Sequence, residues 1–340
     1  MKHVGLEISN RSVRFIEFKS DRCGHIPFRY DEVKLPAGVI VNGEILEKEE
    51  FRKILSAFNK KNKLSFARVS IPEDKAYIFI TDIPFVEDSM VADSVAFRIE
   101  ENVPMSAYET LFDYEIIKKD PLAKKISVVV SVIPKKIIHD YLDVLLSCGI
   151  KPLSFKIESW ATAKSIVKKT DKKTQVIVNV KESKTVLSIV SNNIPLFSAV
   201  VYLGEESIRK SLKKVFPNVD ENSPVDVNGE LIPSNTANND AFNTLLNDFT
   251  IIKDEINKLF IYWYTHKSNE EEKLKINEII LIGKATLISG FSEYIANNLK
   301  TKVRFANVWV NCFSLDKVVP NIEFEDSLKY ATAVGLAISK

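Results

Sequence analysis

Polar side chains that could take part in phosphate or metal chemistry lie in two short turns of this sequence. The first turn, within HVGLEISNRSVRFIEFK (3–19), supplies Glu7, Ser9, Asn10, Arg11, Ser12 and Arg14. The second, within IVNVKESKTVLSIV (177–190), supplies Asn179, Lys181, Ser183 and Thr185. Backbone N–H groups in such turns can bind phosphate, and a carboxylate such as that of Glu7 can bind magnesium or its waters. The first question is whether these turns hold a nucleotide.

Both turns lie between apolar runs, which is the pattern of a β-hairpin. Glu7 and Asn179 are 172 residues apart (179 − 7), about half of the 340-residue chain. We therefore expect a duplicated, two-lobed α/β architecture.

Composition and charge narrow the class of protein. The chain is 45% hydrophobic and 27% charged, with 47 Lys and Arg against 45 Asp and Glu. The net charge of +2 gives no overall field for nucleic acid. The start of the chain lacks the pattern of a signal peptide, and no apolar run reaches the length of a membrane span. The widely spaced Cys23, Cys148 and Cys312 form no zinc motif, and we expect them to be reduced and buried or inert. These features predict a cytoplasmic globular protein.

The segment between the hairpins divides into two parts. A turn and an amphipathic helix within 35–61 precede a strand at 66–72, and a helix is predicted at 87–103, strands at 111–119 and 125–133, and a helix at 135–149. The region from about 75 to 150 is thus predicted to be a helix, strand, strand, helix unit inserted into the first lobe.

Beyond the second hairpin, helices are predicted at 204–216, 242–264 and 289–299, with a buried strand at 276–283 and a small-residue helix near the end. The stretch 217–240 is rich in Asn, Asp, Pro and Ser, which is typical of a solvated loop.

These elements, in this order, resemble the type IV pilus assembly protein PilM family of the actin-like ATPase superfamily, which is related to the cell-division protein FtsA. The resemblance rests on VGLEISNRSVRFIEF, LPAGVIVNGEI, FRIEENVPMSAYETLFDYEI, LLSCGIKPLSFKIESWATAKSI, DEINKLFIYW, IILIGKATLISGFSEYIANNL and KYATAVGLAIS. It implies an actin-like (ribonuclease H-like) fold of two lobes with a nucleotide cleft. The implied first lobe is 1–75 with 150–172, the inserted α+β subdomain is 76–149, and the second lobe is 173–340 with a smaller subdomain at about 203–275.

The family's phosphate hairpins each carry an Asp-x-Gly triplet, and here the chain departs from that pattern. The corresponding triplets are Glu7-Ile8-Ser9 and Asn179-Val180-Lys181, so neither glycine is present. Asn179 lacks the charge that a magnesium shell prefers, and Lys181 either fills the space of the phosphate or binds the phosphate directly. In the adenosine segment Gly283-Lys284-Ala285, Lys284 replaces a glycine, and the family's AE..K signature is missing after 204–216. We expect weak or absent Mg-ATP binding and no hydrolysis.

Two further candidates have a structural alternative. Glu158 matches the family's crossover position near the attacking water, where it would act as a base, or it begins or caps a helix. Glu255 matches the family's EI helix position and is either a nucleotide contact or a surface or interlobe residue.

The resemblance implies a cytoplasmic bacterial scaffold, held at the inner membrane by its partners in a type IV pilus or a related type II secretion system. The implied partner is the cytoplasmic N-terminal tail of a PilN-type membrane protein, bound in a groove between the first lobe and the inserted subdomain. Other pilus platform proteins and self-association are further implied contacts. The alternative is an active actin-like ATPase or an FtsA-like filament-forming protein.

Two lysine groups complete the candidates. Lys118, Lys119, Lys124 and Lys125 either face acidic partner residues or solvate a hairpin. Nucleic-acid binding through these and Lys168, Lys169, Lys172 and Lys173 is not expected, because no aromatic residues are interleaved with the lysines.

Overall fold

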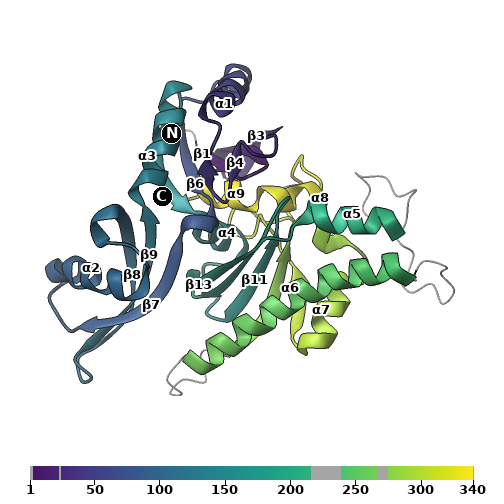
Figure 1. Cartoon of the computed structure of the whole chain (residues 1–340). Helices are drawn as coiled ribbons and strands as arrows, with labels where there is room; N and C mark the ends of the chain where they lie inside the picture. The colour runs from purple at the N-terminus through teal and green to yellow at the C-terminus, as the bar shows by residue number, and fades with distance from the viewer. Residues whose placement is uncertain (1–2, 23, 216–238, 267–274, 340) are drawn as a thin grey trace. The chain divides into compact units, whose positions relative to one another are not determined.

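The computed structural model describes residues 3–22, 24–215, 239–266 and 275–339, which form two compact units (Figure 1). The first unit comprises Met1–Lys164, Ile194–Ser198 and Thr332–Lys340, and the second comprises Ser165–Asn193 and Ala199–Ala331. The lobe and subdomain boundaries given above remain predictions.

The first unit contains a five-stranded sheet in the order β10-β6-β1-β2-β3. Its strands are β1 (His3–Ile8), β2 (Ser12–Asp21), β3 (Gly24–Lys34), β6 (Phe66–Ile71) and β10 (Lys151–Ile157). β1 runs antiparallel to β2 and parallel to β6. The amphipathic helix α1 (Lys48–Asn62) buries Phe51, Leu55 and Phe58, and the Phe58 ring packs edge-on against Phe15 of β2. The predicted first hairpin is therefore part of a sheet with a helix packed on one face.

The small residues near the C-terminus are explained by close packing. α9 (Ala331–Ala337) lies so near β1 that a Cβ on Gly5 would fall 2.0 Å from the Ala333 carbonyl oxygen. A Cβ on Gly335 would fall 1.7 Å from the carbonyl oxygen of Ala161 in α4 (Glu158–Ile166). Larger residues at these positions would separate the helices and the sheet.

The segment inserted between β6 and β10 forms a small sheet of its own, in the order β7-β9-β8. β7 (Tyr77–Pro84), β8 (Thr110–Asp120) and β9 (Lys125–Pro134) are antiparallel, and α2 (Val91–Asn102) lies beside them (Figure 1). Val91, Val95 and Ile99 of α2 pack into the core of this sheet. The helix, strand, strand, helix prediction was incomplete because it missed β7, whose run YIFITDIP does not alternate and ends at proline. α3 (Lys135–Ser147) follows β9, and the short β4 (Ile40–Val41) and β5 (Glu44–Ile45) pair with each other.

The second five-stranded sheet has the order β13-β12-β11-β14-β15. Its strands are β11 (Thr174–Val180), β12 (Thr185–Ser191), β13 (Ile194–Val201), β14 (Ile276–Ile282) and β15 (Lys302–Phe305). All residues of β11 and β12 are buried. The helices are α5 (Glu205–Val215), α6 (Asn239–His266), α7 (Phe291–Leu299) and the short α8 (Phe324–Ser327). Residues 217–238 of the predicted solvated loop 217–240 lie outside the described residues, and its last two residues belong to α6.

The two large sheets have the same plan, as the 172-residue offset predicts. In each, an antiparallel hairpin is followed across the sheet by a parallel strand, β6 beside β1 and β14 beside β11. The pairs Ile8–Val13 and Val180–Thr185 close the two hairpins at corresponding positions.

Two expectations from composition concern membranes and cysteines. No helix in the described part of the chain has both the length and the apolarity to cross a bilayer. Cys312 is buried, and burial raises its pKa to about 12, so this thiol is inert at neutral pH. Cys148 is only half-buried and accepts a hydrogen bond from Ser56 Oγ, and Cys23 lies outside the described residues.

Candidate functional site

The turn of the first hairpin is held together by the hydroxyl of Ser9. The Ser9 N–H donates to the Ser12 carbonyl oxygen at 2.9 Å. Ser9 Oγ accepts from the backbone N–H groups of Ser12 at 3.1 Å and Arg11 at 3.4 Å. These N–H groups are of the kind that would bind a phosphate in such a turn, and here a side chain of the turn itself occupies them.

Asn10 connects this turn to a polar cluster inside the first unit. Its Oδ1 accepts the N–H of Gly43 at 3.1 Å, and the Gly43 carbonyl oxygen accepts the hydroxyl of Tyr141 at 3.1 Å. Burial raises the pKa of Tyr141 well above its usual value, and the charges of Glu158 and Asp74 raise it further. Asn10 is thus linked through Gly43 to a buried tyrosine hydroxyl, and the charge of Glu158 acts on the same hydroxyl.

Glu7 and Arg14, both predicted site residues, lie opposite each other across the hairpin. Glu7 is 1% exposed, and its Oε2 is 4.0 Å from Arg14 Nη1. Arg14 Nη2 also contacts Glu32 Oε1 at 2.9 Å. A guanidinium therefore lies beside the carboxylate that was the metal candidate.

Glu158 forms a reciprocal pair with Glu73, a residue that the sequence analysis did not identify. Glu158 Oε2 accepts the N–H of Glu73 at 3.3 Å, and Glu73 Oε2 accepts the N–H of Ser159 at 3.0 Å. Both side chains are at most 2% exposed. Burial and the neighbouring charge of Glu158 raise the pKa of Glu73. Glu158 is the first residue of α4, in agreement with the alternative that it begins a helix.

The second turn, 181–184, is covered by the segment that begins α5. The Lys181 N–H donates to the Lys184 carbonyl oxygen at 2.8 Å. The carbonyl oxygens of Lys181 and Glu182 accept the N–H groups of Glu205 and Glu206, each at 2.8 Å. A helix N-terminus is a common anion site, but these two N–H groups of α5 are bonded to the turn.

Two further features strengthen this closure. A Cβ on Gly204 would lie 2.4 Å from the backbone nitrogen of Lys184 and 2.6 Å from the carbonyl oxygens of Lys181 and Glu182. The predicted residue Thr185 donates its hydroxyl to the Leu203 carbonyl oxygen at 2.7 Å. Asn179 and Lys181 are buried and Ser183 is half-buried, so the chain itself surrounds this turn.

Gly283 and Lys284 follow β14, next to the second hairpin. Gly283 has φ of 101°, and a Cβ there would lie 2.0 Å from the Val180 carbonyl oxygen, so close packing against β11 requires glycine. Lys284 Nζ forms an ion pair of 2.6 Å with Asp326 Oδ1. Burial alone would raise the pKa of Asp326, but the hydrogen bond from Lys284 and the charge of Lys329 lower it.

Glu255 and the first lysine group also have partners within the chain. On α6, Glu255 Oε1 contacts Lys258 Nζ at 2.6 Å. Lys118 and Lys125 pair with Asp120 and Asp82 at 3.6 and 2.9 Å, and Lys119 pairs with Asp88. This geometry is that of a solvated hairpin, the second of the two interpretations given for these lysines.

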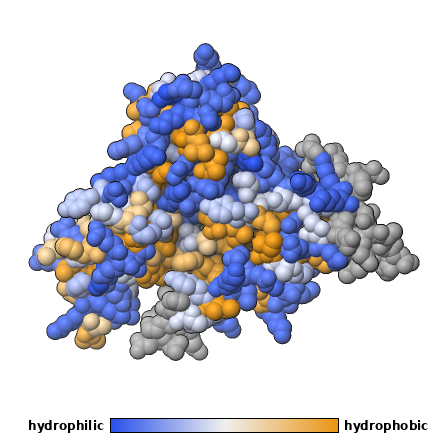
Figure 2. Space-filling view, in the orientation of Figure 1, coloured by the Kyte–Doolittle hydropathy of each residue, from blue (hydrophilic) through white to orange (hydrophobic). Residues whose placement is uncertain are grey.

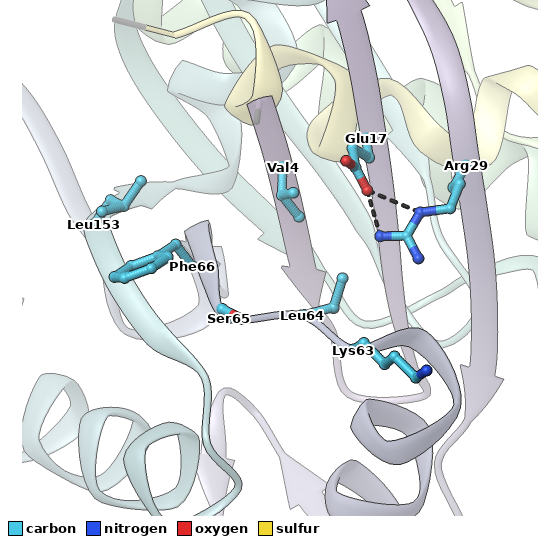
Figure 3. A pocket seen from close by; sticks show the side chains of 8 residues that line it. All are labelled: Val4, Glu17, Arg29, Lys63, Leu64, Ser65, Phe66 and Leu153. Atoms are coloured by element: carbon cyan, nitrogen blue, oxygen red, sulfur yellow. Dashed lines mark hydrogen bonds and ion pairs between the residues drawn. The ribbon is translucent and has the colours of Figure 1, made fainter. Parts of the chain in front are cut away.

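A pocket of about 170 Å³ lies at the end of the first sheet away from the turn (Figure 3). Its lining residues are Val4, Glu17, Arg29, Lys63, Leu64, Ser65, Phe66 and Leu153. Arg29 forms an ion pair with Glu17 and donates to the Asn62 carbonyl oxygen at the end of α1. The pocket is smaller than the usual ~300 Å³ lower limit for small-molecule sites. In the part of the chain that the structure describes, no three His, Cys, Asp or Glu side chains are arranged to hold a metal ion.

Sequence reasoning missed Glu73, Gly204 and Asp326, which hold the predicted residues in place. Glu73 follows the proline that ends the strand 66–72, and that position resembles an ordinary turn. Gly204 is the first residue of the helix predicted at 204–216, and a glycine at the start of a helix is a signal that could have identified it. Asp326 carries no local signal.

Two duplicated sheets with a small inserted sheet define an actin-like fold, and solved structures agree. One similar structure, titled PilM-PilN type IV pilus biogenesis complex, has a TM-score of 0.76 and 13% identity, covering 99% of this chain and 98% of that chain. The ethanolamine utilization protein EutJ of Carboxydothermus hydrogenoformans has a TM-score of 0.52 and 12% identity, covering 99% and 89%. MreB 5 of Spiroplasma citri bound to AMPPNP has a TM-score of 0.52 and 11% identity, covering 98% and 93%. The predicted fold class is confirmed.

The family follows from the sequence itself. Residues 5–340 match the family described as type IV pilus assembly protein PilM. The chain belongs to this family, as the resemblance predicted. Comparison with curated protein sequences gives no match.

Proposed function

We propose that this protein is a cytoplasmic scaffold of the inner-membrane assembly platform of a type IV pilus or a related type II secretion system. It binds the cytoplasmic N-terminal tail of a PilN-like membrane protein. The observation that carries the proposal is the match to the PilM family over residues 5–340, with a fold similar over 99% of the chain to a structure titled as a PilM-PilN complex.

The second part of the proposal is that the nucleotide loops are degenerate and the protein is not an ATPase. Support comes from the turns: the Ser9 hydroxyl takes the N–H groups of the first, and α5 covers the second. Arg14 beside Glu7 opposes a magnesium ion at that carboxylate, and Lys284 is engaged by Asp326. Transfer of a phosphoryl group requires bound metal and a positioned nucleophile together, and these residues favour neither.

The inserted subdomain offers an apolar surface for the tail. Phe97 on α2 is 81% exposed and Tyr108 is 88% exposed. Glu100 of α2 accepts the Ala107 N–H at 3.1 Å, so Phe97 and Tyr108 lie on two elements that are tied together. Apolar residues are visible over this part of the molecule in Figure 2. Large apolar side chains that are this exposed, on two elements that are tied together, favour a protein contact.

The test is a calorimetric titration of the full chain with a synthetic peptide of the PilN-like tail from the same organism. We expect saturable binding, and we expect Phe97→Ala with Tyr108→Ala to weaken it at least tenfold. The matched control is Tyr202→Ala, because Tyr202 is 62% exposed and belongs to the second unit. Absence of binding to the unmodified protein would contradict the scaffold proposal, and equal losses in both variants would contradict the assignment of the surface.

A second titration, with Mg-ATP and with phosphate release followed in parallel, tests the degenerate loops. We expect no saturable heat and no phosphate release above the buffer control. Tight binding with turnover would instead support the active ATPase.

A further inference from the structure

Six lysines gather at one edge of the second sheet. Because β11, β14 and β15 are parallel, their N-terminal ends lie at the same edge. Lys172 and Lys173 precede β11, Lys275 precedes β14, and Lys302 begins β15. Lys168 and Lys169 lie in the segment that leads to β11, and all six side chains are exposed. We call these six residues the lysine edge.

The backbone of the segment 168–173 is held by its neighbours. Asn193, in the turn between β12 and β13, donates its side-chain amide to the Lys168 carbonyl oxygen at 2.9 Å. The Lys169 N–H donates to Asn311 Oδ1 at 3.2 Å, and Asp171 Oδ1 accepts the Lys173 N–H at 3.0 Å. The lysines are therefore presented from a fixed backbone, which reduces the entropy lost when they bind.

The charge of the lysine edge is not neutralised by the described residues. None of the six lysines forms an ion pair within the described ranges, whereas three of the four lysines at 118–125 do. The carboxylate of Asp171 accepts from neutral donors, and Glu278 pairs with Arg304. Glu270, Glu271 and Glu272 lie outside the described residues.

Apolar side chains lie beside this edge. The hydroxyl of Tyr264, on α6, accepts the N–H of Ile276 at the start of β14 at 3.2 Å. Tyr264 is half exposed, and so is Ile261 one turn earlier. Lysines next to an exposed tyrosine and an aliphatic side chain are typical of surfaces that rest on lipid headgroups.

We propose that the lysine edge binds an anionic lipid bilayer directly. Each lysine near such a surface adds an attraction that salt screens, and Tyr264 and Ile261 contact the headgroup region. Single-stranded nucleic acid is bound by rows of stacking aromatics, and the aromatic side chain that a hydrogen bond places at this edge is that of Tyr264. Duplex nucleic acid would be attracted by the lysines themselves, so its binding is an outcome of the test below. The inference goes beyond the binding of a partner tail, because the bilayer contact requires no partner.

The test is flotation of the full chain, without any tail peptide, on phosphatidylglycerol-containing vesicles and on phosphatidylcholine vesicles at about 0.1 M salt. We expect binding to the anionic vesicles alone. Each lysine near an anionic surface strengthens binding roughly fivefold, and salt reduces this contribution. Replacement of Lys168, Lys169, Lys172 and Lys173 by Gln is therefore expected to weaken vesicle binding at least tenfold. The matched control replaces Lys118, Lys119, Lys124 and Lys125 by Gln, which removes the same formal charge and is expected to weaken binding less than threefold.

Several results would overturn the proposal. These are absence of binding to anionic vesicles, equal losses in the two quadruple variants, or binding of a short fluorescent oligonucleotide in place of vesicles. Thermal unfolding followed by circular dichroism checks that both variants are folded, which the exposure of the replaced side chains leads us to expect. Since no tail peptide is present, these results do not depend on whether the scaffold proposal is correct.

Discussion

The turns 9–12 and 181–184 have the same backbone hydrogen bond but are closed by different groups. In each, the first N–H donates to the carbonyl oxygen three residues later, at 2.9 and 2.8 Å. In the first turn the Ser9 hydroxyl accepts the N–H groups of Arg11 and Ser12, and in the second the N-terminus of α5 donates to the carbonyl oxygens of Lys181 and Glu182. A duplicated hairpin can therefore keep its register while different groups take over the positions around it.

The residues that follow the neighbouring parallel strand also differ between the two sheets. Glu73 follows β6 and Lys284 follows β14, each as the first residue of a short 3-10 helix. Glu73 meets another carboxylate in a buried site, whereas Lys284 meets the carboxylate of Asp326. The pKa of Glu73 is raised, chiefly by burial, and the pKa of Asp326 is lowered by the lysines around it. The contributions of these two carboxyl groups to stability should therefore change with pH in opposite directions.

The substitution with the largest expected effect is one that disrupts the packing of α5 on the second turn. Gly204→Ala places a Cβ 2.4 Å from backbone, which cannot move without shifting α5 or the turn. We expect a loss of about 3 kcal/mol in the free energy of unfolding, measured by urea denaturation. Ser207→Ala, at an exposed position of the same helix, is the control and is expected to be near neutral. Equal midpoints would mean that α5 does not close the turn.

A second change would make the second turn like a phosphate loop. Lys181→Gly with Asn179→Asp removes the side chain from the turn and restores a carboxylate, so we expect saturable Mg-ATP binding to appear in calorimetry, where the parent protein is expected to show none. Ser183→Gly adds a glycine to the same turn but keeps Lys181, and it is expected to give no gain. If affinity does not change in the double variant, residues 179–181 do not correspond to the family's phosphate triplet.

A third change tests the buried carboxylate pair of the first unit. Because the pKa of Glu73 is raised above its ordinary value of 4.5, the folded state keeps the proton to higher pH than the unfolded state does. Stability should therefore fall as the pH rises from the ordinary value through the raised one. Glu73→Gln is expected to stabilise the protein by about 1 kcal/mol at pH 8, and less near pH 5. Urea midpoints at the two pH values decide this, and a variant that is less stable at pH 8 would contradict the expected sign.

The smallest expected effect belongs to the corresponding lysine of the second unit. Lys284→Met should cost about 0.5 kcal/mol at neutral pH, since Asp326 is partly exposed and solvent screens the pair. Asp326 has a lowered pKa, so this stabilisation is present above its ordinary value of 3.8 and is lost as the pH falls through the lowered one. High salt should reduce the difference between variant and parent in thermal unfolding. A loss that is independent of salt would point to packing of the lysine stem instead.

Local patterns were enough to predict much of the fold. The hairpins around Ser9 and Lys181, the buried run 276–282 and the amphipathic helix at 48–62 follow from periodicity, which depends on neighbouring residues alone. The order of the elements was enough to predict the family, which the match over residues 5–340 shows. By contrast, β7 was missed because its identity depends on pairing with β9, about fifty residues later.

The sequence by itself determined which residues stand in the two turns and that neither turn contains a glycine. Tertiary structure alone decided what those residues touch: Glu158 meets Glu73, Lys284 meets Asp326, and α5 covers Lys181. The physical reason is that hydrogen bonds and ion pairs depend on distances of about 3 Å. The partners are separated by 85 residues for Glu73 and Glu158, a distance along the chain at which no local pattern constrains their contact.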